Sequence, residues 1–249
     1  MSLPIESILG AIQFIISVFV AYKLHKSVKK KPSNINIKYF YYTFILLSVV
    51  FAFSAISVVS VINFRSDFLI SAINIIGRGF ILLGVMFFAY IPLNILKDNF
   101  WKSVLPFVIL IIAVLSNLFS LMSLFNYPRT PVAEFGSFIL RTHRADMFTS
   151  VGVGAIGITA IFTLALAIYK YFQIVYEDFD DSYVFKRGLL IISAAIFFIF
   201  GITSNYFLAF RFPVFGRVTG EAMFLVALIL FLTSVLYKKE GDLTTDVEM

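Results

Sequence analysis

The chain contains no cysteine, which excludes disulfides, thiolate metal sites and cysteine nucleophiles. Charge is also scarce, since only 14% of the 249 residues are charged, whereas about a quarter of a typical soluble domain is. Hydrophobic residues make up 60% of the sequence, and they fall into long uninterrupted blocks rather than short periodic runs. A soluble fold of this length could not bury so much apolar surface, so we expect lipid to surround most of the chain.

Histidine is nearly absent, and the two histidines are poorly placed for chemistry. His25 and His143 are predicted on opposite sides of the membrane, which excludes a haem held by two histidines within the bundle. His143, Asp146 and Glu134 do not have the spacing of a strong metal motif. The apolar segments hold no carboxylate pair and no histidine that could activate a serine. We therefore expect no enzyme activity, no cofactor and no resident metal ion.

Long apolar segments are what the sequence does have. A membrane-spanning helix needs about 20 mostly apolar residues. Seven segments meet this requirement: about 4–22, 39–64, 68–96, 103–125, 147–169, 188–210 and 218–237. The first is predicted to be a retained helix rather than a signal peptide, because Glu6 precedes it and lysines follow it. The sequence predicts an all-α polytopic bundle of seven transmembrane helices, forming a single domain over residues 1–249 with a short cytoplasmic tail at 238–249.

Basic residues in the loops predict the orientation, because Lys and Arg stay in the cytoplasm during insertion. The loops after the first, third and fifth segments, together with the tail, hold thirteen Lys and Arg residues, whereas the other loops hold six. The first side carries every lysine of the chain: Lys23, Lys26, Lys29, Lys30, Lys31, Lys38, Lys97, Lys102, Lys170, Lys186, Lys238 and Lys239. We predict that this side is cytoplasmic, with the N-terminus outside and the C-terminus in the cytoplasm.

The longest outer loop runs from Asn126 to Asp146. Within it, Val132, Phe135, Phe138 and Ile139 have helical spacing. This spacing predicts an amphipathic helix that rests on the membrane surface.

Two ionisable residues lie well inside the apolar blocks, Arg78 in the third and Glu221 in the seventh. A charge at this depth costs about 2.5 kcal/mol or more unless it is paired or hydrated. Residue counting places both toward the outer boundary, with Asn74 one turn before Arg78 and Asn205 near the outer end of the sixth segment. We hypothesise a ligand pocket open to the outside and lined by these four residues. In the alternative, Arg78 extends to the headgroups and Glu221 pairs with Arg217.

Small and amide side chains inside the segments are interpreted as packing devices. Gly152, Gly154 and Gly157 spell G-x-G-x-x-G, but a spanning helix cannot form the nucleotide-binding turn of that motif. They are typical of close helix contacts. Gln13 and Asn117 lie toward the middle of the first and fourth segments, where each is expected to hydrogen-bond to a neighbouring helix.

Seven helices with the N-terminus outside resemble the architecture of rhodopsins and other heptahelical receptors. A retinal protein of that family attaches its chromophore to a lysine of the seventh helix. No lysine lies between Val218 and Tyr237, and the single tryptophan, Trp101, is in a predicted cytoplasmic loop. The resemblance therefore implies topology alone, and covalent retinal is excluded.

Three functions agree with these features. In the first, a sensor or receptor-like bundle, a small-molecule ligand in the outer pocket biases two helix arrangements, and the cytoplasmic loops pass the change to a separate protein partner. The alternatives are an accessory or scaffold subunit of a membrane complex, and a small-solute transporter or channel with Gln13 on its path. The basic loops suit anionic lipid headgroups rather than nucleic acid. We expect a multi-pass protein of the cell membrane, in contact with the lipid bilayer.

Overall fold

The computed structural model describes residues 5–64, 67–126, 132–135, 138–141, 146–177 and 181–237. Its elements are α1 (Ile5–Lys30), α2 (Ile35–Phe64), α3 (Asp67–Ile95), α4 (Asn99–Asn126), β1 (Val132–Phe135), β2 (Phe138–Arg141), α5 (Met147–Glu177), α6 (Ser182–Thr203), the π-helical turn η1 (Ser204–Leu208), α7 (Ala209–Arg211) and α8 (Pro213–Leu236). α6, η1 and α7 together form one span, Ser182–Arg211. Seven helical spans are long and apolar enough to cross a membrane. The chain is an all-α, multi-pass integral membrane protein, as predicted.

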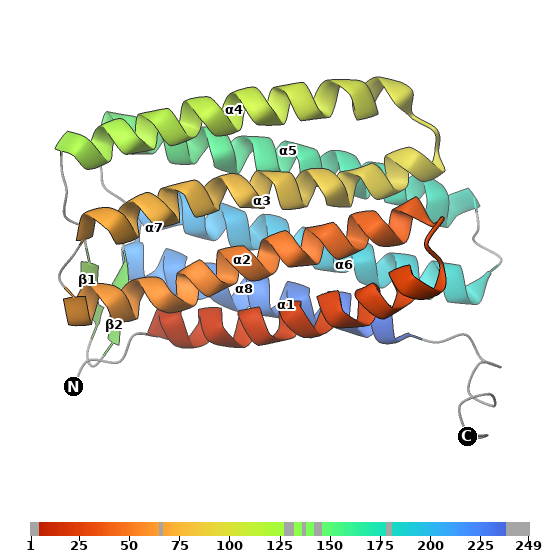
Figure 1. Ribbon diagram of the computed structural model, residues 1–249, viewed down its shortest axis with the longest axis horizontal. Helices are drawn as coiled ribbons and strands as arrows, with labels where there is room; N and C mark the ends of the chain where they lie inside the picture. The colour runs from red at the N-terminus through yellow and green to blue at the C-terminus, as the bar shows by residue number, and fades with distance from the viewer. Residues whose placement is uncertain are drawn as a thin grey trace.

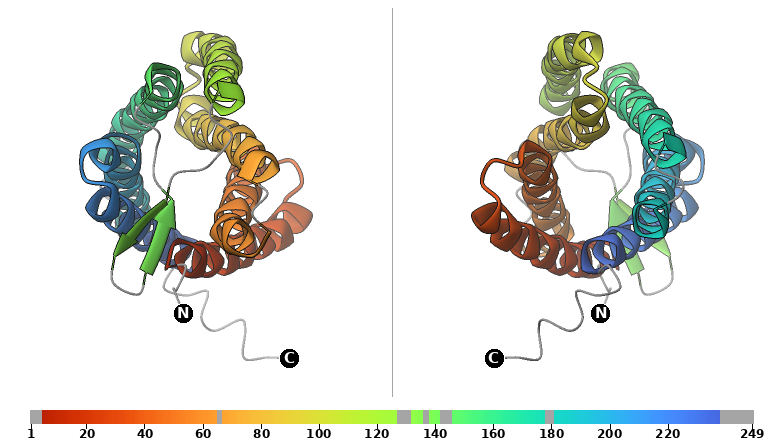
Figure 2. Two further views of the ribbon diagram at one scale, coloured as in Figure 1. Left: turned by 90° about the vertical axis from the view of Figure 1, so that its left-hand side faces the viewer. Right: turned by 90° about the vertical axis from the view of Figure 1, so that its right-hand side faces the viewer.

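Six of the seven spans form a closed ring. In order around it, α1 contacts α2, α2 contacts α3, α3 contacts α5, α5 contacts α6, α6 contacts α8, and α8 returns to α1. Helix α4 lies outside the ring and packs on α3 and α5, as both views in Figure 2 show. It is also the least buried of the seven spans. Lipid therefore faces α4 on most of its sides, and the interior of the protein belongs to the other six spans.

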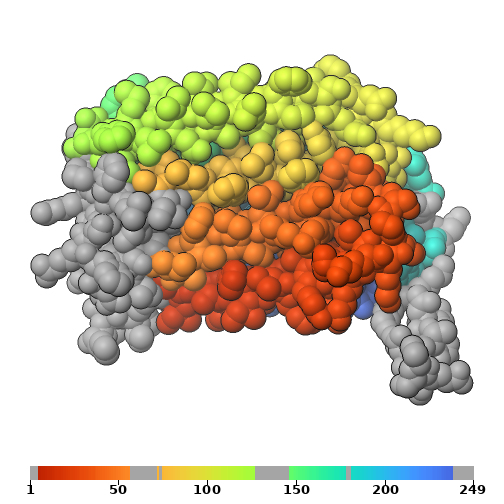
Figure 3. All heavy atoms as spheres, viewed as in Figure 1, coloured from red at the N-terminus to blue at the C-terminus, as the bar shows by residue number. Residues whose placement is uncertain are grey.

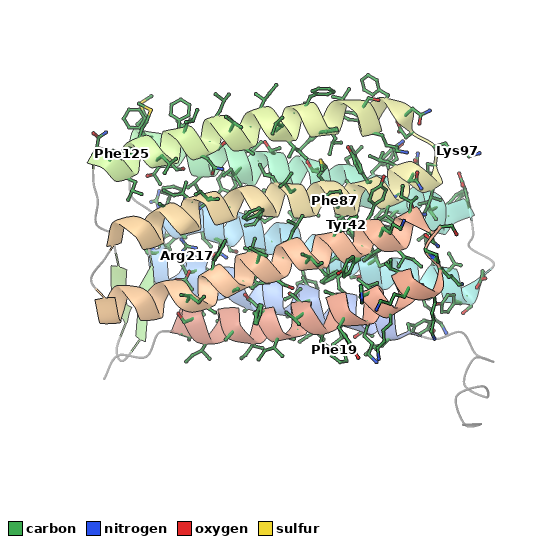
Figure 4. The ribbon with its side chains drawn as sticks, viewed as in Figure 1. Phe19, Tyr42, Phe87, Lys97, Phe125 and Arg217 are labelled. Atoms are coloured by element: carbon green, nitrogen blue, oxygen red, sulfur yellow. The ribbon has the colours of Figure 1, made fainter. Side chains whose placement is uncertain are left out.

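The two ends of the bundle differ in charge. At one end, on the right of Figure 1, lie the C-terminal ends of α1, α3, α5 and α8, and the described lysines are at or near it. We call it the lysine end; Lys97 marks it in Figure 4. The opposite end carries β1 and β2, and we call it the hairpin end; Arg217 lies toward it. That the lysine end faces the cytoplasm remains a prediction from the distribution of lysine, and the tail at 238–249 lies outside the described residues.

At the lysine end the helices continue beyond the apolar blocks. α1 extends from about residue 22 to Lys30, α5 extends from about residue 169 to Glu177, and α6 begins at Ser182 rather than near 188. Asp181 caps α6, because its carboxylate accepts from the backbone N–H groups of Tyr183 and Val184. Hydropathy marks only the hydrocarbon thickness, whereas capping groups set where a helix begins and ends.

The outer loop does not contain the predicted surface helix. Residues 132–135 and 138–141 form two antiparallel strands, which we call the hairpin, in which Val132 pairs with Arg141 and Phe135 pairs with Phe138. Gly136 and Ser137 separate the strands in the sequence, and a two-residue connection that starts with glycine is typical of a tight hairpin. The helical interpretation was wrong because the spacing of a few apolar residues outweighed this turn signal.

The hairpin lies across one side of the ring. β2 contacts α1 and α2, and β1 contacts α8. Figure 2 shows it in front of α1 and α8 when the hairpin end faces the viewer. A loop that leaves α4, outside the ring, therefore reaches the mouth of the ring.

Phenylalanine fills the ring toward the lysine end. Phe40, Phe44, Phe88 and Phe231 form an inner phenylalanine cluster, with ring centroids between 5.5 and 6.5 Å apart. Phe44 and Phe88 are almost completely buried. Because most of these pairs meet edge to face, they have a favoured aromatic geometry. They make this layer of the ring interior mostly apolar.

Two of the three glycines in the G-x-G-x-x-G stretch serve helix packing. A Cβ atom on Gly152 would lie 2.7 Å from the carbonyl oxygen of Ser116, so α4 and α5 touch there. A Cβ on Gly157 would lie 3.0 Å from the ring of Phe207. Gly154 has nothing within 4 Å of that position. The packing prediction is confirmed for Gly152 and Gly157, and it is wrong for Gly154 within this chain.

Candidate polar site at the hairpin end

Three of the four predicted pocket residues line a single cavity. Arg78 on α3, Asn205 in η1 and Glu221 on α8 all contribute to a cavity of about 80 Å³ inside the ring. The fourth, Asn74, lies in α3 one turn before Arg78, and its side chain is outside the described part of the molecule. Residues from three spans separated in sequence thus meet at one level, and ligand binding there stays a prediction.

The same cavity contains two charged residues that the pocket hypothesis did not include. Glu6, near the start of α1, and Arg217, near the start of α8, also line it. Glu6 is fully buried, and Glu221 and Arg217 are 5% and 8% exposed. The cavity therefore has two carboxylates and two guanidinium groups, and with all four ionised its formal charge is zero.

Amide groups hold the carboxylate of Glu221. Gln13 Nε2 donates to Glu221 Oε2 at 3.0 Å and to the backbone oxygen of Glu221 at 2.9 Å. Asn205 Nδ2 donates to Glu221 Oε1 at 3.2 Å. Hydrogen bonds from α1 and from η1 therefore fix both carboxylate oxygens of a residue on α8. The prediction that Gln13 hydrogen-bonds to another helix is confirmed.

The alternative prediction was a direct pair between Glu221 and Arg217, but the structure links the two residues through the amide of Asn205. Arg217 Nη1 donates to Asn205 Oδ1 at 3.4 Å, and Asn205 donates onward to Glu221. The two charged residues, one turn apart on α8, are thus bridged by the amide of Asn205. Arg78 is half-buried and lines the cavity, so its position is not that of an arginine that only extends to the headgroups.

A π-helical turn places the bridging amide. Asn205 and Tyr206 lie in η1, where the N–H of Ala209 reaches the oxygen of Ser204 five residues back. Such turns are rare and frequently occur at functional sites. Gly220 makes the close contact possible, because a Cβ there would lie 2.6 Å from Asn205 Cγ. Any other residue at this position would push the Asn205 amide away from α8.

The cavity is closed toward the lysine end by aromatic rings. Phe51, Phe198 and Phe224 form this phenylalanine floor, with Phe224 4.8 Å from Phe198 and 6.3 Å from Phe51 between ring centroids. A Cβ on Gly201 would lie only 2.5 Å from the Phe224 ring, so glycine lets that ring sit against α6. The floor separates the four charges from the inner phenylalanine cluster beneath it.

Toward the hairpin end, the lining residues are buried or half-buried. The hairpin backbone contacts α1, α2 and α8, three of the helices that carry lining residues. A solute that enters from outside, as the pocket hypothesis requires, would therefore pass close to the hairpin. The present volume is about half of the roughly 150 Å³ of an engineered cavity that holds benzene, so the cavity fits a few waters or one very small solute.

Several buried polar atoms lack a partner among the described residues. Gln13 Oε1 and Ser17 Oγ lie one turn apart on α1, and both residues are fully buried. Leaving such an atom without a hydrogen bond costs about 1–3 kcal/mol. Because Gln13 donates to the backbone oxygen of Glu221, its amide cannot turn round to satisfy Oε1 without losing that bond. Gln13 therefore offers an acceptor beside the carboxylate.

The predicted hydrogen bond from Asn117 to a neighbouring helix is not found among the described residues. Its Nδ2 lies 3.1 Å from the position of a Cβ on Gly79, and its Oδ1 has no hydrogen-bond partner in the described part of the chain. The predicted bond from α4 to a neighbour is absent there.

The candidate metal ligands of the outer loop have other placements. Asp146 caps α5, because it accepts from the N–H of Thr149 at 2.9 Å and from the hydroxyl of Ser123 at 2.8 Å. His143 and the Glu134 side chain lie outside the described part. Among the described residues, no group of three His, Cys, Asp or Glu side chains is placed to hold a metal ion.

Two features of the sequence point to Glu6 as part of this site. It lies at the very start of the first apolar block, and Gln13 follows seven residues later, which is two helical turns on the same face. Counting it would have corrected the expectation that the helices hold no carboxylate pair, because Glu6 is close enough to act electrostatically on Glu221. No sequence signal pointed to the π turn that brings Asn205 to the same place.

No protein-family model, no curated protein and no solved structure matches this chain.

Proposed function

We propose that this protein is a heptahelical sensor whose cavity at the hairpin end binds a small polar solute and whose lysine end passes the change to a separate protein. One observation carries the proposal: two acidic and two basic side chains surround a small cavity that the phenylalanine floor closes from beneath. Charges inside a membrane protein are expensive and usually functional. If the residues had only a structural role, apolar side chains of similar size would fill the space at a lower cost in free energy.

The chemistry of the cavity selects the ligand class. Both signs of charge are present, and the amide of Asn205 lies between Arg217 and Glu221. A solute with both a donor and an acceptor, or an ion that carries its own water, matches this lining. The volume of about 80 Å³ limits the ligand to a few non-hydrogen atoms, since drug-sized sites are about 300–1,000 Å³.

A route for the signal runs along α6 and α8. At the cavity, Asn205 and Glu221 join the two spans. At the lysine end, the hydroxyl of Tyr183 on α6 donates to the backbone oxygen of Tyr237 at 3.3 Å, and their rings stack with centroids 5.7 Å apart. A ligand that alters the first junction changes the relative position of the same two spans at the second. A protein partner at the lysine-end loops would detect that change.

A transporter is less well supported. Below the floor, the space between Thr43, Phe88, Phe198 and Phe231 is only about 10 Å³. A solute would have to pass two layers made mostly of phenylalanine, and Thr43 is a poor substitute for its water because its hydroxyl is already bonded to the backbone oxygens of Tyr39 and Gly84. The hydrogen-bonding groups of the cavity thus face a closed end.

An accessory subunit is the second candidate, and α4 favours it. This helix lies outside the ring, and its exposed apolar residues follow its whole length, including Phe107, Leu110, Ile111, Leu118 and Phe125. A helix of another protein could pack on that face without disturbing the six-span ring. Lipid would cover it equally well, which is why the sensor ranks first.

The sensor proposal is tested by thermal unfolding of the protein in lipid nanodiscs, with and without formate, acetate, glycine, urea, guanidinium and inorganic anions. A solute at 100 times its Kd adds about 2.7 kcal/mol of stability, which raises the midpoint by several degrees. In Glu221→Gln, the carboxylate is lost with little change in shape, and the ligand-induced shift should disappear. Glu177→Gln changes an exposed glutamate at the lysine end and should keep it.

The fluorescence of the single tryptophan gives a second measurement. Trp101 lies at the start of α4, at the lysine end. If binding is communicated through the bundle, a stabilising solute should also change Trp101 emission in the wild type but not in Glu221→Gln. The proposal is contradicted if no solute stabilises the protein, or if the shift persists in Glu221→Gln. Uptake of the solute into liposomes would instead identify a transporter.

A further inference from the structure

A second cavity lies on the outer surface of the ring, between α1 and α2. It has a volume of about 560 Å³, and apolar side chains line most of it, including Phe14 and Val18 of α1 and Ile45 and Val49 of α2. Figure 3 shows the face of the molecule on which these two helices lie. Val18 and Ile45 are 42% and 37% exposed. The cavity is thus an elongated groove on the surface that faces lipid, and we call it the α1/α2 groove.

The α1/α2 groove extends from the lysine end to the middle of the bundle. On α2 it runs from Tyr41 to Phe53, which is about 18 Å at 1.5 Å per residue. One leaflet contributes about 15 Å of a hydrocarbon core of about 30 Å. An acyl chain from the leaflet at the lysine end therefore fits the groove from mouth to end.

Positive charge surrounds the mouth of the groove. Tyr22 lines it, and the ammonium group of Lys26 lies 4.5 Å from the centroid of the Tyr22 ring. His25 lines it on the same side, with its ring 5.4 Å from that of Tyr41. After Glu6, helix α1 contains no acidic residue, whereas its last eight residues include three further lysines, Lys23, Lys29 and Lys30.

The closed end of the groove adjoins the polar cavity. Phe53 lines both spaces, and a Cβ on Gly77 would lie 2.8 Å from its ring. Glycine at position 77 therefore lets this one ring form the wall between the α1/α2 groove and the charged residues.

We infer that the α1/α2 groove is a binding site for a phospholipid of the leaflet at the lysine end, with the acyl chain along α1 and α2 and an anionic headgroup at Lys26 and His25. The volume and length of the groove match a chain, and the charge of its mouth selects the headgroup. The site is independent of the proposed sensor function. A cation near an anionic headgroup contributes about 1 kcal/mol, which is about a fivefold preference over a zwitterionic lipid.

Tryptophan quenching by brominated lipid tests the site in the full-length protein. In a Trp101→Phe background, Val18→Trp places a reporter in the groove, and Leu115→Trp places a control on α4. The two positions are similarly exposed, at 42% and 47%. Nanodiscs of phosphatidylcholine receive increasing fractions of brominated phosphatidylglycerol or brominated phosphatidylcholine.

We expect the Val18→Trp reporter to be quenched by phosphatidylglycerol with about a fivefold preference, and the α4 reporter to show none. Adding Lys26→Gln should reduce the preference toward one, and Ala52→Phe, which fills the groove, should remove the excess quenching. Wild-type protein photolysed with a diazirine-tailed phosphatidylglycerol gives a readout that needs no substitution, with labels concentrated in α1 and α2. Equal quenching of the two reporters, or labels spread evenly over α4, would overturn the proposal.

Discussion

The two ends of the bundle handle polar groups in opposite ways. At the lysine end, polar side chains pair in the open or half-buried: Lys170 meets Asp98 at 2.9 Å, and Asn94 donates to Asn36 at 2.8 Å and accepts from Lys102 at 3.0 Å. At the hairpin end, Glu6, Arg217 and Glu221 are buried around a cavity that their side chains do not fill.

The polar pairs at the lysine end connect neighbouring helices, whereas the charged residues at the hairpin end surround a cavity between helices. The pairs of the lysine end connect α2, α3, α4, α5 and the turn before α4, where water and headgroups lower the cost of each charge. Most of the charges of the hairpin end are buried and depend on each other and on two amides. A change to one residue should therefore have a small effect at the lysine end and a large effect at the hairpin end.

The largest effect is expected from Glu221→Ala. It leaves the amides of Gln13 and Asn205 and the guanidinium groups of the cavity without their carboxylate, and breaking a buried charge network costs about 3–5 kcal/mol. Thermal unfolding in detergent should show a clear fall in the midpoint, and Arg78→Ala should behave in the same direction. The matched change Glu177→Ala, at an exposed site of the lysine end, should leave the midpoint nearly unchanged. Equal midpoints for Glu221→Ala and wild type would contradict a linked charge site.

Next in size is Gly220→Ala. The added methyl group would lie 2.6 Å from Asn205 Cγ, and overpacking of this kind costs about 1–3 kcal/mol. The control is Gly154→Ala, where nothing lies within 4 Å and the better helix propensity of alanine should stabilise by about 0.5–1 kcal/mol. The two midpoints should move in opposite directions. If both rose, Gly220 would not set the position of Asn205.

A smaller effect is expected from Asn94→Ala at the lysine end. The substitution removes the hydrogen bonds that Asn94 makes to Asn36 and Lys102, and half-buried bonds of this kind contribute about 0.5–1.5 kcal/mol each. Asn99→Ala removes an exposed amide from the neighbouring turn and serves as the control. A loss as large as that of Glu221→Ala would remove the contrast between the two ends.

The smallest effect concerns two aspartates that cap helices at opposite ends. The hydrogen bond from Lys170 is the main cause that lowers the pKa of Asp98 below its usual 3.8. Burial raises the pKa of Asp146, but hydrogen bonds from Thr149 and Ser123 outweigh it, and the net direction is again downward. Each ionised carboxylate therefore contributes stability above the usual pKa, and this contribution is lost as pH falls through the lower folded value.

Unfolding midpoints at pH 7 and pH 3, each at two salt concentrations, should separate the two caps. Asp98→Asn should lose about 0.2–1 kcal/mol at pH 7 and little at pH 3, with a salt-dependent difference because an ion pair is lost. Asp146→Asn should lose less, because asparagine is also a good cap, and salt should not change it. If salt changed the effect of Asp146→Asn but not that of Asp98→Asn, the ion pair would belong to Asp146 and not to Asp98, and the prediction would be wrong.

The membrane fold could be predicted because hydrocarbon permits few alternatives. An uncharged block such as 39–64 must be a helix in lipid, and the structure has α2 there. The depth of Arg78 and Glu221 also followed from residue counting, since rise per residue is fixed. Local lengths and depths were therefore accessible from the sequence.

Contacts between spans were not accessible to the same degree. The rotation of each helix decides which residues face the cavity, and hydropathy does not report it when all faces are apolar. For Glu6, only its seven-residue spacing to Gln13 indicated the side of α1 on which it lies, and the π turn at Ser204–Leu208 has no recognisable sequence pattern. The hairpin was missed because a loop outside the hydrocarbon has water to satisfy its backbone and so more conformations to choose from.

The π turn inserts one extra residue into the sixth span. If η1 relaxed to regular α-helix, one residue would leave the wide turn, and α7 would rotate relative to α6 by about 100°. Phe212 alone separates α7 from α8, so the rotation would reach the helix that carries Arg217 and Glu221. A shift of one residue at this point would rotate the segment beside the charged cluster and bring its charged side chains closer together or farther apart, while the rest of the ring stays in place.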